Sequence, residues 1–130
     1  MCAAVTEKRR ILIVDDEELI VMPMRKYFEG LRYDVDTALE LDAAKDLLLA
    51  RPYDLVIADL RLTGTGGAEG LEIVSTVQRC SDTTRIILLS AYGTPEIERE
   101  SYARGADAFL HKPKGMMEIA SIARSLLGES

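Results

Sequence analysis

Five polar residues stand at the ends of four short apolar runs in this sequence. They are three carboxylates, one hydroxyl and one amine: Asp15, Asp16, Asp59, Ser90 and Lys112. If the runs are strands of an open parallel sheet, their carboxyl ends meet at one edge, which is where such sheets bind ligands. The spacing therefore predicts that these five side chains share one site.

The residue types of this set indicate phosphoryl chemistry. Three neighbouring carboxylates repel one another unless a cation or raised pKa values relieve them. Their oxygen atoms suit Mg²⁺, which would neutralise charge on a phosphoryl group while one carboxylate attacks the phosphorus. Lys112 would add a second positive charge, and Ser90 a hydroxyl donor. The set thus predicts transfer of a phosphoryl group to an aspartate.

Each of these residues alone also has an ordinary structural explanation. An acidic pair after a strand is favoured by the dipole of the helix that follows. An aspartate at a strand end is commonly a turn residue. The right residue types at successive strand ends, in order, favour the functional interpretation of the whole set.

Apolar segments of two kinds alternate along the chain and predict the scaffold of the site. Short apolar runs predict strands at 11–14, 33–37, 55–58, 86–89 and 108–110. Helical spacing predicts helices at 19–28, 41–48, 71–77, 96–104 and 116–127. The alternation predicts a parallel sheet covered by helices on both faces. Pro23 lies inside the first helical pattern, so that helix either starts late enough to hold Pro23 in its first turn or is kinked there.

Composition narrows the classes of protein that fit. A length of 130 residues suits one compact domain. The formal net charge of -6 argues against direct nucleic-acid binding by this chain and against adhesion to anionic membranes. No apolar run is long enough to span a bilayer, and the first ten residues lack the apolar core of a signal peptide. Cys2 and Cys80 have no disulfide or metal-site pattern, so a reduced, cytoplasmic location is expected.

Four stretches of sequence together are specific for one known family. They are Ile-Leu-Ile-Val-Asp-Asp-Glu (11–17), Asp-Leu-Val-Ile-Ala-Asp-Leu (54–60), Leu-Leu-Ser-Ala (88–91) and Gly-Ala-Asp-Ala-Phe-Leu-His-Lys-Pro (105–113). In this order and spacing, the chain resembles the receiver domains of bacterial two-component response regulators. The resemblance implies an α/β, flavodoxin-like doubly wound fold with a five-stranded parallel sheet in the order 2-1-3-4-5 and five helices. It also implies a single receiver domain over residues 1–130, with no output domain in this chain.

The resemblance implies a chemical role for each residue of the set. Asp59 corresponds to the aspartate that accepts the phosphoryl group from a sensor histidine kinase or a phosphotransfer protein. Asp15, Asp16 and Asp59, with the main-chain carbonyl of Arg61, would hold Mg²⁺. Lys112 would supply the counter-charge, and the bond that follows it, to a proline, is usually cis in relatives. Such a domain is a signalling module that assists its own phosphorylation and dephosphorylation, and it is not an enzyme.

Two further functions are implied for residues near the acceptor. Ser90 corresponds to the hydroxyl that follows the phosphoryl group when the domain switches, and Phe109 to the aromatic residue that then turns inward. Arg61 and Tyr92 stand at the two variable positions that tune the lifetime of the phosphorylated state. The downstream target, a protein partner or an effector domain, cannot be read from the sequence.

The sequence departs from the family pattern in one loop, and other functions remain open. Thr63 stands where relatives carry a proline, within a longer, glycine-rich segment at 63–70. An alternative is a haloacid-dehalogenase-type phosphatase with Asp59 as nucleophile, although Arg61 replaces the second aspartate that this family needs. Another is a flavodoxin-like carrier, although its phosphate loop would follow the first strand. The last is a degenerate receiver that binds partners without phosphorylation, which the complete set of key residues argues against.

Overall fold

The computed structural model describes residues 8–61, 69–91 and 93–129 of the chain. Within them, strands and helices alternate as the sequence predicts. The strands are β1 (Arg10–Val14), β2 (Asp34–Ala38), β3 (Leu55–Asp59), β4 (Arg85–Ser90) and β5 (Ala108–His111). The helices are α1 (Glu18–Gly30), α2 (Leu41–Ala50), α3 (Glu69–Cys80), α4 (Pro95–Arg104) and α5 (Met116–Leu126). None of these helices is both long and apolar enough to cross a bilayer.

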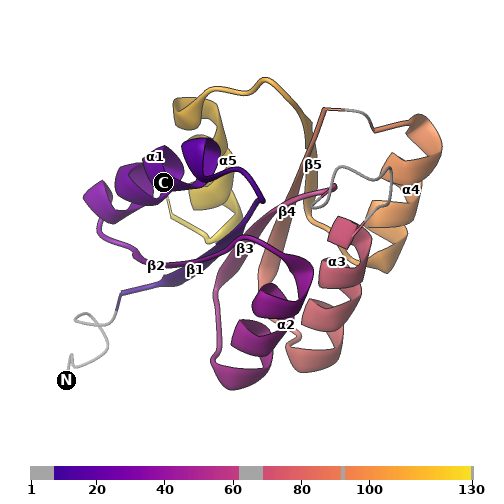
Figure 1. The fold of residues 1–130 in the computed structure, drawn as a ribbon, viewed down its shortest axis with the longest axis horizontal. Helices are drawn as coiled ribbons and strands as arrows, with labels where there is room; N and C mark the ends of the chain where they lie inside the picture. Colours follow the sequence, from indigo (N-terminus) through magenta and orange to yellow (C-terminus); the bar gives the residue numbers. More distant parts are fainter. Residues whose placement is uncertain (1–7, 62–68, 92, 130) are drawn as a thin grey trace.

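The five strands form one parallel sheet in the order β2-β1-β3-β4-β5 (Figure 1). Every neighbouring pair is parallel, so all five carboxyl ends lie along one edge. The order reverses direction between β1 and β3, and this reversal opens a crevice where their carboxyl ends stand side by side. The predicted doubly wound fold and strand order are confirmed.

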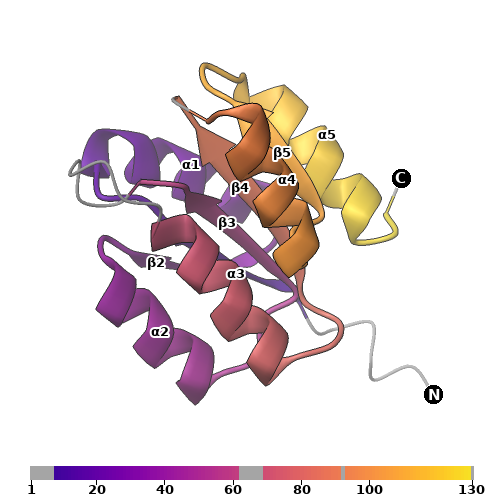
Figure 2. The same cartoon turned by 90° about the vertical axis from the view of Figure 1, so that its right-hand side faces the viewer.

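Helices cover both faces of the sheet, because the central strands are apolar on both sides. Figure 1 shows α1 and α5 on one side of the sheet and α2, α3 and α4 on the other, and Figure 2 shows the second group face-on. Alternate strand residues supply the two cores: Leu12 and Val56 lie in the core beneath α2 and α3, whereas Ile13 and Ile57 lie in the core beneath α1 and α5. The sheet that carries the polar edge is therefore held from both sides.

Helix α4 shows how local sequence fixes the start and end of an element. The Thr94 side chain accepts a hydrogen bond from the N–H of Ile97 at 3.2 Å, and Pro95 occupies the first helical turn. The helix ends at Gly105, whose φ of 120° lies in the left-handed region that glycine tolerates best. Pro23 behaves differently, since α1 begins at Glu18 and places this proline inside the helix. The late start considered for α1 is therefore excluded.

Candidate functional site

Four strand ends bring the predicted polar residues together. Asp15 directly follows β1, Asp59 and Ser90 are the last residues of β3 and β4, and Lys112 directly follows β5. The Nζ atom of Lys112 lies 3.3 Å from Oδ2 of Asp15 and 3.2 Å from Oδ2 of Asp59. One ammonium group therefore bridges the carboxylates of two strands. The bond between Lys112 and Pro113 is cis, as the family resemblance implies.

Backbone groups hold the two buried carboxylates in place. Oδ1 of Asp15, a residue only 2% exposed, accepts a hydrogen bond from the N–H of Glu17 at 3.0 Å. Oδ1 of Asp59 accepts one from the N–H of Arg61 at 3.3 Å. Each carboxylate therefore uses one oxygen for the backbone and turns the other to Lys112.

Gly70 allows helix α3 to pack closely behind Asp59. A Cβ atom at this position would lie 2.8 Å from both the main-chain oxygen of Asp59 and the Cα of Leu60. The N–H of Gly70 donates to the carbonyl oxygen of Leu60 at 2.8 Å. Since a larger residue would push α3 away from the end of β3, this glycine helps to fix the position of α3 beside Asp59.

The electrostatics of the site favour binding of a cation. Burial raises the pKa of Asp59, and the negative charge of Asp15 raises it further, although Lys112 acts in the opposite direction. Burial alone would lower the pKa of Lys112, but the combined attraction of Asp15 and Asp59 outweighs it and raises this pKa. Lys112 therefore stays charged at neutral pH, and the burial of Asp59 still outweighs its effect on the pKa of that carboxylate.

The carboxylates at the end of β1 form a possible cation site. Oxygen atoms of Asp15, Asp16 and Glu17 all lie within 4.8 Å of one another. Asp16 and Glu17 are exposed, so a hydrated ion can reach them. This donor set consists of oxygen atoms alone and fits a hard divalent cation such as Mg²⁺. Glu17 was not among the predicted ligands, although it continues the acidic run that begins at Asp15.

Asp59 opens onto a pocket of about 550 Å³. The pocket is lined by Asp16, Glu17, Ile20, Asp59, Arg61, Ser90, Ala91 and Lys112. Four of the five predicted polar residues thus line it. The fifth, Asp15, is buried, and its carboxylate contacts the ammonium group of Lys112. Tyr92 and residues 62–68, which include Thr63 and most of the glycine-rich segment, lie outside the described residues.

Ser90, which lines this pocket, lies close to Phe109. The carbonyl oxygen of Ser90 accepts a hydrogen bond from the N–H of Lys112 at 2.7 Å. A Cβ atom on Gly93 would lie 3.1 Å from the Ser90 hydroxyl oxygen and 2.5 Å from Cζ of Phe109. Phe109 is only 5% exposed, so its ring already points inward in this structure.

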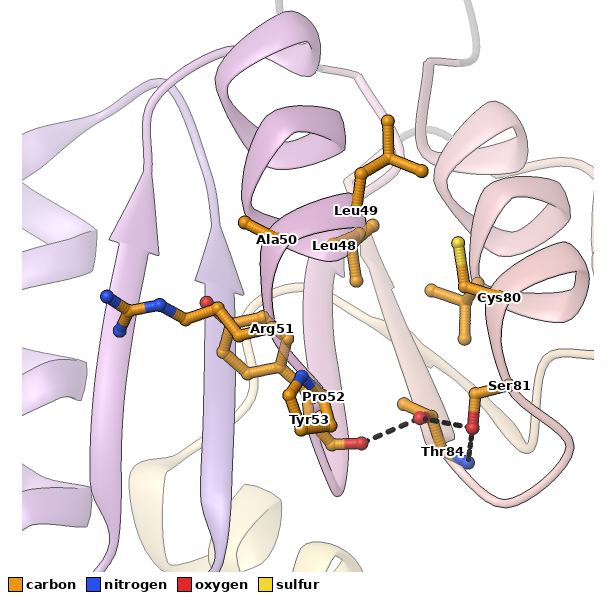
Figure 3. Close-up of a pocket in the computed structure, with 10 residues that line it drawn as sticks. Leu48, Leu49, Ala50, Arg51, Pro52, Tyr53, Cys80, Ser81 and Thr84 are labelled. Atoms are coloured by element: carbon orange, nitrogen blue, oxygen red, sulfur yellow. Dashed lines mark hydrogen bonds between the residues drawn. The ribbon is translucent and has the colours of Figure 1, made fainter.

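A second pocket lies at the other end of the strands, beside the starts of β3 and β4 (Figure 3). Its volume is about 420 Å³, and it is enclosed by the C-terminal parts of α2 and α3 and by residues that precede β3 and β4. The hydroxyl of Thr84 donates to the carbonyl oxygen of Tyr53 at 2.6 Å and lies 2.9 Å from the hydroxyl of Ser81. Its described lining includes exposed Cys80 and no carboxylate, whereas that of the first pocket includes Asp16, Glu17 and Asp59.

Known proteins that resemble this chain include response regulators and their receiver domains. The family model described as the response regulator receiver domain matches residues 11–124. The chain belongs to this family. It is 32% identical over 122 residues to the transcriptional regulatory protein ResD of Bacillus subtilis, covering 94% of this chain and 49% of ResD. It is also 32% identical to the phosphate regulon transcriptional regulatory protein PhoB of Rhizobium meliloti, over 91% of this chain and 52% of PhoB. This receiver therefore spans about half the length of these relatives.

Solved structures share the fold of this receiver. A CheY-like receiver domain protein from Methanospirillum hungatei superposes with a TM-score of 0.88 at 24% identity, over 94% of this chain and 95% of that one. A response regulator from Burkholderia pseudomallei superposes with a TM-score of 0.82 at 24% identity, over 93% of this chain and 69% of that one. That structure contains a phosphorylated aspartic acid and a calcium ion.

Family membership assigns this chain to two-component signalling rather than to a catalytic family. It favours the receiver over the phosphatase and the flavin carrier that the sequence left open. Receiver domains bind a divalent metal at an acidic pocket, and this chain has an acidic cluster at the corresponding edge of its sheet.

The different environments of Asp15 and Asp16 lead to a testable difference between their variants. Asp16→Ala should bind Mg²⁺ at least about tenfold more weakly but melt no lower in EDTA, because the exposed carboxylate is only repelled by its neighbours. Asp15→Ala should also lose affinity for Mg²⁺, and in addition lose about 1–2 kcal/mol of stability, because Lys112 and the N–H of Glu17 lose a partner. Calorimetric titration and thermal melts measure the two effects. Equal melting losses in EDTA would mean that Asp16 has a structural role at the start of α1.

Proposed function

We propose that this receiver accepts a phosphoryl group on Asp59 from a sensor histidine kinase or a phosphotransfer protein, in a Mg²⁺-dependent reaction that changes a partner-binding face. The observation that carries the proposal is the position of Asp59. Its carboxylate lies at the rim of the pocket, 3.2 Å from the ammonium of Lys112 and beside the acidic cluster. The phosphorylated aspartic acid of the Burkholderia relative supports the same chemistry.

The reaction is an in-line displacement at phosphorus. An oxygen of Asp59 attacks the phosphorus of the donor, and the bond from phosphorus to the donor's nitrogen or oxygen breaks with its electron pair remaining on the donor. Lys112 lies where it can pair with an oxygen of the transferred group, because it already contacts the Asp59 carboxylate. Asp15, Asp16, Asp59 and the main-chain carbonyl of Arg61 would hold Mg²⁺, which would supply further positive charge during the transfer.

Ser90 and Phe109 form the switch in this proposal. Once Asp59 carries a phosphoryl group, the Ser90 hydroxyl donates to one of its oxygen atoms, and Phe109 occupies the space beside it. The phosphoryl group then binds one arrangement of the site better than the other, which is what a change of population requires. The nearness of Ser90 and Phe109 to the same glycine supports this coupling.

Arg61 and Tyr92 set the lifetime of the phosphorylated state in this proposal. Hydrolysis needs a water in line with the breaking bond, and both side chains are large. Arg61 lines the pocket that holds Asp59. Neither residue is a carboxylate or amide suited to orient a water, so a slow loss of the phosphoryl group is expected.

The proposal extends to the domain organisation, the output and the cellular location of the protein. Residues 1–130 form a single receiver domain, and its output lies in a partner protein or an effector domain. The net charge of -6 and the absence of a disulfide pattern in the sequence support a cytoplasmic location without direct nucleic-acid or membrane binding by this chain.

Intact-mass measurement tests the proposed function. The protein is incubated with acetyl phosphate, or with a phosphorylated histidine kinase, in Mg²⁺ or in EDTA. One phosphoryl group should be added in Mg²⁺, removed by hydroxylamine as an acyl phosphate is, and largely missing in EDTA. An unchanged mass with both donors in Mg²⁺ would leave the chain as a receiver that binds partners without phosphorylation.

Ser90→Ala tests the switch separately from phosphorylation. The variant should still accept the phosphoryl group, but the shift of the Phe109 amide resonance on addition of beryllofluoride should fall by at least about half, since the hydroxyl that distinguishes the two states is gone. Ser90→Thr keeps the hydroxyl and should respond like the wild type. A full response from Ser90→Ala would contradict the proposed coupling.

A further inference from the structure

Strand β5 is an edge of the sheet, and one of its outward N–H groups has an unusual acceptor. The N–H of Lys112 points to β4, where it donates to Ser90. Because successive residues of a strand alternate in direction, the N–H of Phe109 points to the open side, away from β4. It donates to the hydroxyl oxygen of Tyr102 at 3.1 Å. Tyr102 lies in the last turn of α4, so one side chain joins this helix to the backbone of the switch residue.

Helix α4 has few other anchors on the sheet. Its sequence is polar, and Ser101 is its one fully buried residue, with a hydroxyl that donates to the carbonyl oxygen of Glu98 in the same helix. Ile97 packs, partly buried, against the core, and Arg104 reaches α3 rather than the sheet. The contact of Glu98 with His111 is 3.6 Å long, exposed, and attractive only when the histidine is protonated. Among the hydrogen bonds of the described residues, the one that joins α4 directly to β5 is therefore the bond from the N–H of Phe109 to the hydroxyl of Tyr102.

Phe109 also touches the segment just before α4. Its ring lies against Gly93, since a Cβ there would be 2.5 Å from Cζ of the ring. Thr94, the N-cap of α4, is the next residue. Phe109 thus contacts the segment just before α4 through its ring, and the last turn of α4 through its N–H. A displacement of Phe109 would therefore move the segment just before α4 and the last turn of α4. The whole helix moves with Phe109 only if both of these contacts are kept.

From this arrangement we infer that Tyr102 is a positioning residue of the switch, which makes helix α4 follow the backbone of Phe109. The inference rests on the proposed function, because it assigns the means by which a change at Ser90 and Phe109 reaches a surface helix. The hydroxyl makes this connection, on a residue that is only about half buried: Tyr102 is 46% exposed. Removal of the hydroxyl should consequently leave the fold intact while it uncouples α4 from β5.

The variant Tyr102→Phe tests this inference in two measurements. In the free protein, hydrogen exchange of the Phe109 amide should become about fivefold faster, because its acceptor is lost. On addition of beryllofluoride with Mg²⁺, the amide resonances of Phe109 should still shift, whereas the shifts across Ile97 to Arg104 should fall to less than about half of the wild-type values. A merely structural role would lower the melting temperature but leave the ratio of the α4 shifts to the β5 shifts unchanged.

Tyr27→Phe on α1 is the matched control, and it should change neither the exchange rate nor the ratio of shifts. An unchanged exchange rate at Phe109 in Tyr102→Phe, or a full response of α4, would overturn the inference. Failure of the proposed function has a different signature. Wild-type protein would then show no shift with beryllofluoride, while the exchange rate at Phe109 in the free protein would still report on the hydrogen bond to Tyr102.

Discussion

Asp59→Asn should gain no phosphoryl group from either a small donor or a phosphorylated kinase, whereas Asp82→Asn should be phosphorylated like the wild type. An amide in place of the Asp59 carboxylate removes the nucleophile and one expected ligand of Mg²⁺, but it keeps the size of the side chain. Asp82 is exposed in the loop between α3 and β4, far along the chain from the strand ends that form the site. Intact mass after incubation in Mg²⁺ measures the difference. Full labelling of Asp59→Asn would place the acceptor on another residue.

The same variant should be more stable than the wild type in metal-free buffer at neutral pH. Burial, assisted by Asp15, raises the pKa of Asp59 in the folded protein above its usual value of 3.8. The folded state therefore binds this proton more tightly than the unfolded state, and Asp59 destabilises the fold as the pH rises from 3.8 through the raised pKa. Asparagine has no such charge, so Asp59→Asn should melt measurably higher than the wild type at pH 7 in metal-free buffer.

Two comparisons separate this effect from a general change in packing. The gain should shrink when the pH falls below 3.8, because the wild-type carboxyl is then neutral in both states. It should also shrink when Mg²⁺ is added, because the cation stabilises the wild type and not the variant. A gain that is the same at every pH would show that charge on Asp59 is not its cause.

The sequence predicts this fold well because its central strands are buried on both faces. Runs such as 11–14 and 86–89 are almost wholly apolar and end at polar residues, so both their type and their carboxyl ends can be read directly. The element types that patterning predicts are all present, and the predicted and observed ends differ by at most three residues. The strand order depends on contacts between segments far apart in the chain, and it was expected from the family resemblance rather than from the pattern of residues.

The finer structure of the site depends on tertiary contacts that the spacing of residues along the sequence does not reveal. Asp15 and Asp16 are adjacent in sequence, yet Asp15 is buried and contacts Lys112, whereas Asp16 is exposed. Which of them faces inward is set by the register in which β1 lies between β2 and β3. Tyr102 was missed for a similar reason. In a polar helix it looks like a surface residue, and only the position of α4 beside the edge strand gives its hydroxyl a partner.

Lys112→Ala should reduce the rate of phosphorylation of Asp59 by about a hundredfold or more, even with Mg²⁺ present. The ammonium lies 3.2 Å from the carboxylate of Asp59, the proposed acceptor, and it is the one side-chain cation paired with that carboxylate among the described residues. A fixed positive charge beside the phosphoryl oxygens stabilises the transition state most where water is excluded, and loss of one such donor typically costs this much. Lys114→Ala is the matched control, since among the described residues Lys114 pairs with Glu118 alone, an exposed residue of α5, at 3.9 Å. It should leave the rate within about twofold of the wild type.

The affinity for Mg²⁺ distinguishes a catalytic effect of Lys112 from damage to the site. Removal of the ammonium leaves Asp15 and Asp59 facing each other without a counter-charge, which should cost about 2–3 kcal/mol of stability in EDTA at neutral pH. A cation should restore most of this loss, and Lys112→Ala should bind Mg²⁺ at least as tightly as the wild type, because a competing positive charge is gone. Slow phosphorylation together with undiminished metal affinity would assign Lys112 to the transfer step. A rate within threefold of the wild type would remove it from that step and leave it as a structural counter-ion for the two carboxylates.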